Sequence, residues 1–251
     1  MSRIVFSAIA LPCAVTLLIM GFYPEWDLYI SSFFWTPEYK VFPLVLDPHL
    51  VQFRRASMWI VWALALLPVV AVARKLLFPS SGMLISGRAT LTLVVTLVVG
   101  PLFLVNTVLK PYWGRPRPYE VRQFSGTEEF VSWWDPAGTC RGNCSFVTGE
   151  SSAAYWTLAP ATVLAPPTWK PLAAILAIAF GTLVGIVRVA FGGHFATDVI
   201  ASCLLITLIV WIAHEAVYRY RKTRLSDEQI EGALAAFAER IRRSIVRLWR
   251  A

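Results

Sequence analysis

The sequence carries little charge for its length. Asp, Glu, Lys and Arg together make up 15% of its 251 residues, whereas hydrophobic residues make up 57% and the mean hydropathy is +0.60. Soluble globular domains contain about 25% charged residues. Residues that bind metals are also scarce, with three His and four Cys in the whole chain. The shortage of charge excludes an ordinary soluble domain, and we expect no bound cofactor.

Long apolar runs take the place of charge. A helix that crosses the hydrocarbon core of a bilayer needs about 20 apolar residues, and six stretches of about that length occur, at residues 4–22, 58–78, 90–109, 151–165, 172–190 and 199–218. The fourth is short and contains Pro160. The first could be a cleaved signal peptide, but no small-x-small cleavage site follows it, so we expect a retained helix. The sequence therefore predicts an all-α integral membrane protein, with one six-helix domain over residues 1–220.

The basic residues are distributed unevenly between the two sides of this predicted bundle. The net charge is +8. With the N-terminus inside, the inner connections hold much of the positive charge, namely Arg3, Arg74, Lys75, Arg88, Lys170 and the Arg-rich stretch from Arg219 onward. This arrangement follows the positive-inside rule and leaves residues 23–56, 110–150 and 191–197 outside. Membrane topology thus accounts for the charge, and we expect no nucleic-acid partner.

The tail, residues 221–251, has the pattern of a basic amphipathic helix. Ser226 and Gln229 fit a capping box at its start. Apolar residues follow at a spacing of three and four, at positions 230, 234, 237, 241, 245 and 248, and arginines at 240, 242, 243, 247 and 250 fill the other faces. We expect this helix to lie on anionic lipid at the cytoplasmic side of the membrane. Packing on the bundle or on a second copy of the chain is the alternative.

The four cysteines divide into two kinds. Cys13 and Cys203 lie inside apolar runs and are expected to be core residues. Cys140 and Cys144 lie in the outer loop, where an oxidising compartment would permit a disulfide. A zinc site is the alternative for this pair, but the loop has neither a His nor a second Cys pair. We expect a Cys140–Cys144 disulfide in preference to free thiols.

Three groups of polar residues fall at the outer ends of the predicted helices. Lys110 and Arg117 follow the third helix, Thr148 and Gly149 begin the fourth, and Arg188 ends the fifth. Unpaired cations beside a bilayer are costly, and Arg offers a planar fork that matches phosphate. The free backbone N–H groups at a helix start also favour an anion. Together these residues predict an oxyanion pocket.

His194 and Asp198 form a candidate catalytic pair in the turn between the fifth and sixth helices. If the sixth helix begins at Ala196 or Thr197, one helical turn separates the pair, so that the carboxylate can orient the imidazole and leave one ring nitrogen free to attack. A histidine in a membrane helix can also be a packing residue with a satisfied hydrogen bond. His49 and His214 lack acidic and cationic neighbours of this kind and are expected to be structural.

These residues also resemble the motifs of a known family. The patterns K-x6-RP at residues 110–118 and R-x5-H-x3-D at residues 188–198 are similar to the first and third motifs of the type 2 phosphatidic acid phosphatase (PAP2) superfamily. The resemblance implies a six-helix membrane bundle in which Lys110, Arg117 and Arg188 bind phosphate. It further implies that His194 forms a phosphohistidine intermediate supported by Asp198, with no metal.

The chain departs from the family pattern in its second motif. The family has Pro-Ser-Gly-His, whose His protonates the leaving oxygen, whereas this chain has Val147-Thr148-Gly149-Glu150. Thr148 would replace the Ser hydroxyl and Glu150 the acid. The alternative is that Glu150 is an ionised carboxylate in the first turn of the helix, where it pairs with a pocket arginine. The Ser that commonly precedes the third-motif Arg is Val187 here.

The details of these motifs resemble the lipid A 4'-phosphatase branch of the superfamily. The similar stretches are YWGRPRP, CRGNCSF, the acidic residue at 150 and GGHFATD, and the likeness extends over most of residues 1–220. It implies a bacterial inner-membrane enzyme that removes the 4'-phosphate of lipid A at the periplasmic face. Undecaprenyl diphosphate, phosphatidylglycerophosphate and phosphatidic acid are alternative substrates. A lipid-phosphate binder or transporter without catalysis is an alternative of another class.

Overall fold

The computed structural model describes residues 1–249, with side chains as far as residue 245. Its helices are α1 (Arg3–Phe22), α2 (Glu25–Ser32), α3 (Pro48–Leu77), α4 (Gly87–Leu97), α5 (Lys110–Tyr112), α6 (Gly149–Tyr155), α7 (Leu158–Val163), α8 (Lys170–Ala190), α9 (Ala196–His214) and α10 (Asp227–Trp249). The wider-turned segments η2 (Val98–Leu109) and η5 (Glu215–Arg219) extend α4 and α9. Short 3₁₀ turns η1 (Pro43–Leu46), η3 (Pro118–Glu120) and η4 (Arg122–Phe124) lie in the outer loops.

Within residues 1–249, five helical stretches are long and apolar enough to cross a membrane, which makes the chain a multi-pass membrane protein. They cover Arg3–Phe22, Pro48–Leu77, Gly87–Tyr112, Lys170–Ala190 and Ala196–Arg219. Each contains all or nearly all of one predicted run, because a predominantly apolar run of that length is stable in hydrocarbon only as a helix. The predicted bundle is thus present with five such helices.

The fourth predicted helix, at residues 151–165, differs from the expectation. It forms two short helices, α6 and α7, separated by a turn at Trp156 and Thr157. Pro160 explains the break, because its ring lacks an N–H group and would clash with the Trp156 carbonyl four residues earlier in a continuous helix. The Thr157 hydroxyl donates to the Ala154 carbonyl at 2.7 Å within this turn.

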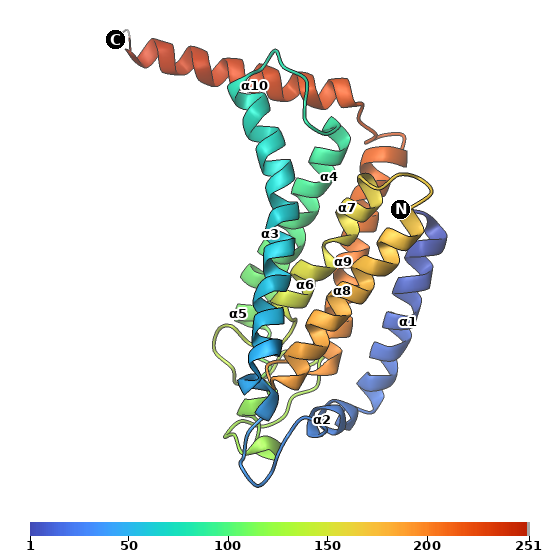
Figure 1. Cartoon of the computed structure of the whole chain (residues 1–251), viewed down its shortest axis with the longest axis vertical. Helices are drawn as coiled ribbons and strands as arrows, with labels where there is room; N and C mark the ends of the chain where they lie inside the picture. The colour runs from blue at the N-terminus through green and yellow to red at the C-terminus, as the bar shows by residue number, and fades with distance from the viewer. Residues whose placement is uncertain (250–251) are drawn as a thin grey trace.

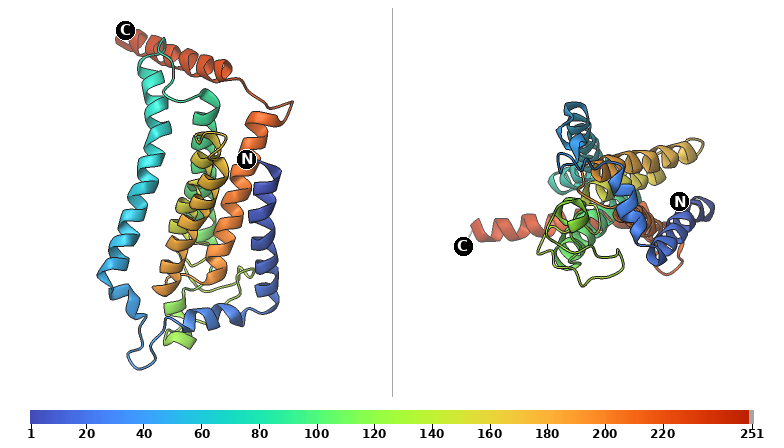
Figure 2. Two further views of the ribbon diagram at one scale, coloured as in Figure 1. Left: turned by 45° about the vertical axis from the view of Figure 1, so that its right-hand side comes forward. Right: turned by 90° about the horizontal axis from the view of Figure 1, so that it is seen from below.

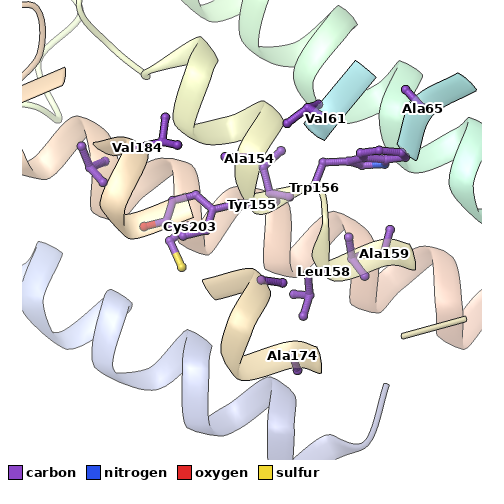
Figure 3. Close-up of a cluster of buried hydrophobic side chains, with 14 of the residues drawn as sticks. Val61, Ala65, Ala154, Tyr155, Trp156, Leu158, Ala159, Ala174, Val184 and Cys203 are labelled. Carbon is purple, nitrogen blue, oxygen red and sulfur yellow. The ribbon is translucent and has the colours of Figure 1, made fainter. Parts of the chain in front are cut away.

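The broken helix fills the centre of the bundle. Trp156 is fully buried and donates its indole N–H to the Thr96 hydroxyl of α4 at 3.0 Å, while its ring lies beside Val61 and Ala65 of α3 (Figure 3). Tyr155 packs on Gly181 of α8 so closely that a Cβ there would lie 2.2 Å from the ring. Small and aromatic residues therefore let α6 and α7 contact α3, α4, α8 and α9 at once.

The tail helix α10 lies across one end of the bundle, and the functional loops lie at the other (Figure 1). Arg88 of α4 pairs with Asp227 of α10 at 3.1 Å, and the Arg88 backbone N–H donates to the same carboxylate at 2.8 Å. The start of the predicted amphipathic helix thus packs on the bundle. Phe237 and Ile241 further along are exposed, and positions 247, 248 and 250 of the predicted pattern lie outside the residues whose side chains are described.

The views in Figure 2 give the arrangement of the spanning helices around α6 and α7. Helix α1 packs along α9, and α3 stands at the opposite side of the bundle. At the end away from α10, the outer loops are held by an aromatic cluster of Trp35, Phe42 and Phe124, with ring centroids 5.0 to 5.6 Å apart. These loops carry the candidate site.

Candidate active site

The predicted site residues lie at helix ends on this face of the bundle. Lys110 ends one spanning helix, Arg188 occupies the last turn of α8, and Asp198 the first turn of α9. The turn between α8 and α9 needs glycine: Gly192 has φ +65°, and a Cβ on Gly193 would lie 2.6 Å from the Arg188 Nη2 atom. The Arg188 guanidinium therefore packs directly on the backbone that precedes His194.

His194 is buried and held in one orientation. Its Nδ1 atom lies 2.7 Å from the Ser145 carbonyl oxygen, which can only accept, so Nδ1 carries the proton and Nε2 has a free lone pair. Asp198 is the predicted orienting group, but its Oδ2 atom is 3.7 Å from Nδ1. The carbonyl of Ser145 is thus the direct partner, and Asp198 contributes its negative charge beside the ring.

The protonation state of His194 fits a nucleophile. Burial lowers the pKa of His194 to about 4, against the opposing attraction of Asp198. The ring is consequently neutral at physiological pH. Because Nδ1 is committed to a carbonyl, the basic nitrogen is Nε2, and a neutral imidazole with a free Nε2 can attack an electrophilic phosphorus.

Asp198 accepts three hydrogen bonds in the buried base of the site. The Phe195 backbone N–H donates at 2.9 Å, the Ser145 hydroxyl donates at 2.5 Å, and the Arg115 guanidinium donates at 2.6 Å. Ser145 therefore contacts both members of the pair, through its carbonyl to His194 and through its hydroxyl to Asp198. This connection is not visible in the sequence, because a backbone carbonyl leaves no residue signature.

Arg115 and Asp27 are two buried residues that the sequence reasoning did not select. Arg115 is fully buried and pairs with Asp27 of α2 at 2.7 Å as well as with Asp198. Asp27 also accepts from the Thr197 backbone N–H at 3.0 Å and from the Thr197 hydroxyl. Arg115 could have been selected from the sequence, because it lies in the GRPRP motif two residues before the predicted phosphate ligand Arg117. Asp27 had none, because it lies 170 residues from Thr197 in an aromatic-rich stretch.

Two buried polar atoms among the predicted phosphate-binding residues lack a hydrogen-bond partner among the described residues. The Arg188 Nε and Thr148 Oγ1 atoms are buried without a hydrogen-bond partner among the described residues. A Cβ on Gly149 would lie 3.3 Å from Lys110 Cε, so the Lys110 side chain rests on the bare backbone at the start of α6. Buried polar groups are normally paired, so these unpaired donors beside cations fit an anion that completes them.

Lys110 and Arg117 are joined by one residue of the disulfide loop. Asn143 accepts from the Lys110 ammonium through its side chain at 3.0 Å and from Arg117 through its backbone carbonyl at 2.7 Å. Cys140 and Cys144 are joined in a disulfide around it, and Asn143 itself has φ +48°. The closed loop therefore presents Asn143 to both cations.

Glu150, the expected proton donor, is held by arginine. Arg54 of α3 makes a bidentate contact with its carboxylate, with Nη2 at 2.5 Å and Nε at 2.8 Å, and the Arg188 Nε atom lies 3.9 Å away. Burial raises the pKa of Glu150, but the Arg54 hydrogen bonds and the nearby Arg188 charge outweigh it and leave the pKa lowered. An ionised carboxylate does not donate a proton, so the geometry favours the alternative in which Glu150 pairs with pocket arginines.

The other two histidines lie apart from this site. His49 is exposed near the start of α3, and His214 stacks on Tyr218 at the far end of α9, with ring centroids 4.8 Å apart. Among the described residues, no group of three or more His, Cys, Asp and Glu side chains is arranged to hold a metal ion.

Comparisons with known proteins agree with the motifs. A model of the PAP2 superfamily matches residues 89–222. A lipid A 4'-phosphatase from Francisella tularensis subsp. novicida (strain U112) is 36% identical over 135 residues, which cover 54% of this chain and 61% of the relative. One from Rhizobium leguminosarum is 38% identical over 133 residues, covering 53% and 56%. The chain thus spans between half and two thirds of the length of these relatives. No solved structure matches it.

Proposed function

Because the chain belongs to the PAP2 superfamily, we propose that it is a membrane-embedded phosphoric monoester hydrolase that removes the 4'-phosphate of lipid A. The relatives that match it carry that name. One observation carries the proposal: a neutral His194 with a free Nε2 atom occurs in the same site as the Arg188 Nε and Thr148 Oγ1 atoms, which are buried without a hydrogen-bond partner among the described residues. A protein that only binds or transports a lipid phosphate would need the cations but not an oriented, neutral histidine.

The proposed reaction has two steps at His194. The Nε2 atom forms a bond to phosphorus as the ester bond to the sugar oxygen breaks, which leaves a phosphohistidine. The sugar oxygen takes a proton from water and leaves as a hydroxyl. Lys110, Arg117 and Arg188 stabilise the charge that develops on the phosphoryl oxygens, and Asp198 stabilises the charged ring. Water then hydrolyses the phosphohistidine and releases phosphate. No metal or cofactor takes part, and Glu150 acts by holding arginines and not as the acid.

The proposal includes the location of the site. With positive residues inside, the site faces the periplasm from the bacterial inner membrane, and α6 with α7 supplies the sixth passage of the chain through the bundle. The tail after residue 220 then lies on the cytoplasmic side, where the exposed Phe237 and Ile241 enter the anionic lipid surface.

A panel of lipid phosphates tests the proposal. Purified protein in detergent is incubated with lipid A, undecaprenyl diphosphate, phosphatidylglycerophosphate and phosphatidic acid, and released phosphate is measured for each. Mass spectrometry of the lipid A product identifies the position that lost phosphate. We expect the fastest release from the 4' position and none with His194→Ala. Equal release by the wild type and His194→Ala would contradict the nucleophile, and faster release from another lipid would contradict the substrate.

A further inference from the structure

Beside the reaction centre, α3 carries an open groove, and apart from Arg54 and Glu150 its lining residues have no part in the mechanism above. The groove has a volume of about 580 Å³ and is lined by Arg54, Arg55, Met58, Trp59, Trp62 and Glu150. A second hollow of about 330 Å³ is lined by Arg188, Gly193 and Lys40, among others, and it also includes Arg54. Arg54 lines both hollows, so the groove on α3 adjoins the hollow that contains Arg188, one of the cations proposed to bind the reacting phosphate.

The lining of the groove changes from charged to apolar along α3. Arg55, Trp59 and Trp62 are spaced by four and three residues, so they lie on one face of the helix. Arg55 precedes the apolar run that begins at Met58, and Trp62 lies about 10 Å further along the axis at 1.5 Å per residue. The groove therefore runs from the level of the lipid headgroups into the level of the acyl chains.

The two arginines of the groove differ in what they contact. Arg54 is engaged with the Glu150 carboxylate, whereas Arg55 is exposed and has no hydrogen bond or ion pair among the described residues. Trp59 and Trp62 are 73% and 65% exposed. A free guanidinium above two exposed indoles fits an amphiphile with an anionic group at one end and an apolar body at the other.

From this adjacency at Arg54 and from the polarity of the groove, we propose that the α3 groove binds a second anionic group of the substrate lipid, at Arg55, while the reacting phosphate lies at Arg188 and His194. This inference rests on the proposed function and extends it to the substrate class. The substrate is a lipid with two separate anionic groups, and its apolar body lies along Trp59 and Trp62. A lipid with only the reacting phosphate leaves Arg55 without a partner and gains nothing from the groove.

Two synthetic lipids separate this subsite from general electrostatics. Both are acylated disaccharides with the same chains and the same reacting phosphate, and only one carries a second phosphate, on the sugar that does not bear the reacting one. The quantity measured is the ratio of kcat/KM for the diphosphorylated lipid to that for the monophosphorylated lipid. We expect a ratio of about ten in the wild type, since a charge-assisted hydrogen bond contributes about that factor, and a ratio near one for Arg55→Gln.

Lys40→Gln is the matched control, because it removes one positive charge from the other hollow on the same face. It should retain the wild-type ratio. A ratio that is unchanged in Arg55→Gln, or lost in Lys40→Gln instead, would overturn the proposal. Equal losses on both lipids in Arg55→Gln would also overturn it, because the residue would then act on the reacting phosphate or on the fold.

Binding to a non-hydrolysing background keeps the two proposals apart. In His194→Ala, native mass spectrometry measures the affinity ratio for the same two lipids, with and without Arg55→Gln. A preference for the diphosphorylated lipid that disappears with Arg55→Gln supports the groove even if the wild type releases no phosphate, a result that would count against the proposed function alone. No preference in the His194→Ala background would overturn the groove.

Discussion

The Arg115 guanidinium joins Asp27 to Asp198, with Nη2 2.7 Å from one carboxylate and Nη1 2.6 Å from the other. All three side chains are buried. The Asp198 carboxylate places negative charge beside His194, and in the proposed reaction this charge would stabilise the imidazolium that forms as phosphorus is attacked. Because Asp27 contacts Arg115 and Thr197, we expect it to be a positioning residue that acts on the proposed reaction through them.

Asp27→Asn should lower both stability and turnover. The change keeps the shape of the side chain but removes one charge from a buried network, so the free energy of unfolding should fall by about 3 kcal/mol. Activity should fall mainly in kcat, since Asp27 does not touch the substrate. Thermal unfolding in detergent and steady-state kinetics measure the two effects. Glu129→Gln, which breaks an exposed pair with Arg122, is the control and should change stability by less than about 1 kcal/mol.

A double-mutant cycle distinguishes positioning from mere stability. If Asp27 acts through Arg115 on Asp198, then Asp27→Asn and Asp198→Asn should be non-additive in kcat, because the second change removes what the first supports. Additive losses in kcat would mean that Asp27 only stabilises the fold.

His194 should make stability depend on pH between about 6.5 and 4. The pKa of His194 is lowered by burial from 6.5 in the unfolded chain to about 4 in the folded protein. In this window the unfolded state therefore binds more protons, and stability decreases as the pH falls. Between pH 7 and pH 5 the loss from this residue should be about 2 kcal/mol. The difference in unfolding between wild type and His194→Gln at the two pH values isolates it, and a difference that does not change with pH would contradict the burial of a neutral ring.

Glu150→Gln should reduce activity on lipid and aryl phosphates equally. If Glu150 holds Arg54 and Arg188, its replacement loosens the cations whatever the leaving group, and a loss of about tenfold is expected from one weakened charge-assisted contact. Arg54→Gln should show the same equal loss. The alternative, in which Glu150 is the general acid, predicts instead that the variant keeps its activity on an aryl phosphate whose leaving group needs no proton. Kinetics on the two substrates decide between them.

Reduction of the Cys140–Cys144 disulfide should weaken phosphate binding more than turnover. The opened loop would no longer hold Asn143 against Lys110 and Arg117, so the inhibition constant of inorganic phosphate should rise severalfold. Mass spectrometry of protein isolated without reductant checks that the bridge is present. A Cys140→Ser/Cys144→Ser double variant is the control, because its inhibition constant should not respond to reductant. An equal response in both proteins would assign the effect to other thiols.

The sequence predicted most of the helices and the residues at their outer ends, because both depend on local patterns. Uncharged runs determine spanning helices by length alone, and motif residues such as Lys110 and Arg188 follow directly from where those helices stop. The break in the fourth helix can be predicted from the sequence, since the clash of Pro160 with the carbonyl of residue 156 is a local effect. Its consequence, two short buried helices, depended on Trp156 packing in the centre of the bundle.

The contacts that hold the site together could not be read from the sequence. Asp27 and Arg115 are 88 residues apart, and Arg54 and Glu150 are 96 apart. Only the folded bundle brings α2 and α3 to the loops of the site. The Arg54–Glu150 contact bears on the role of Glu150. Burial alone raises the pKa of Glu150, whereas contact with arginine lowers it.

Helix α3 carries the outer groove at one end and contacts the tail helix at the other. Its 30 residues make a rod of about 45 Å, and Lys75 near its inner end lies 3.7 Å from Glu231 of α10. A tilt of about 5° over that length displaces one end by about 4 Å relative to the other, which is more than the reach of a hydrogen bond. Because the same helix holds Arg54 and Arg55 at one end and contacts α10 at the other, we expect the lipid surface that surrounds α10 to be a variable of the site at the opposite end of the bundle.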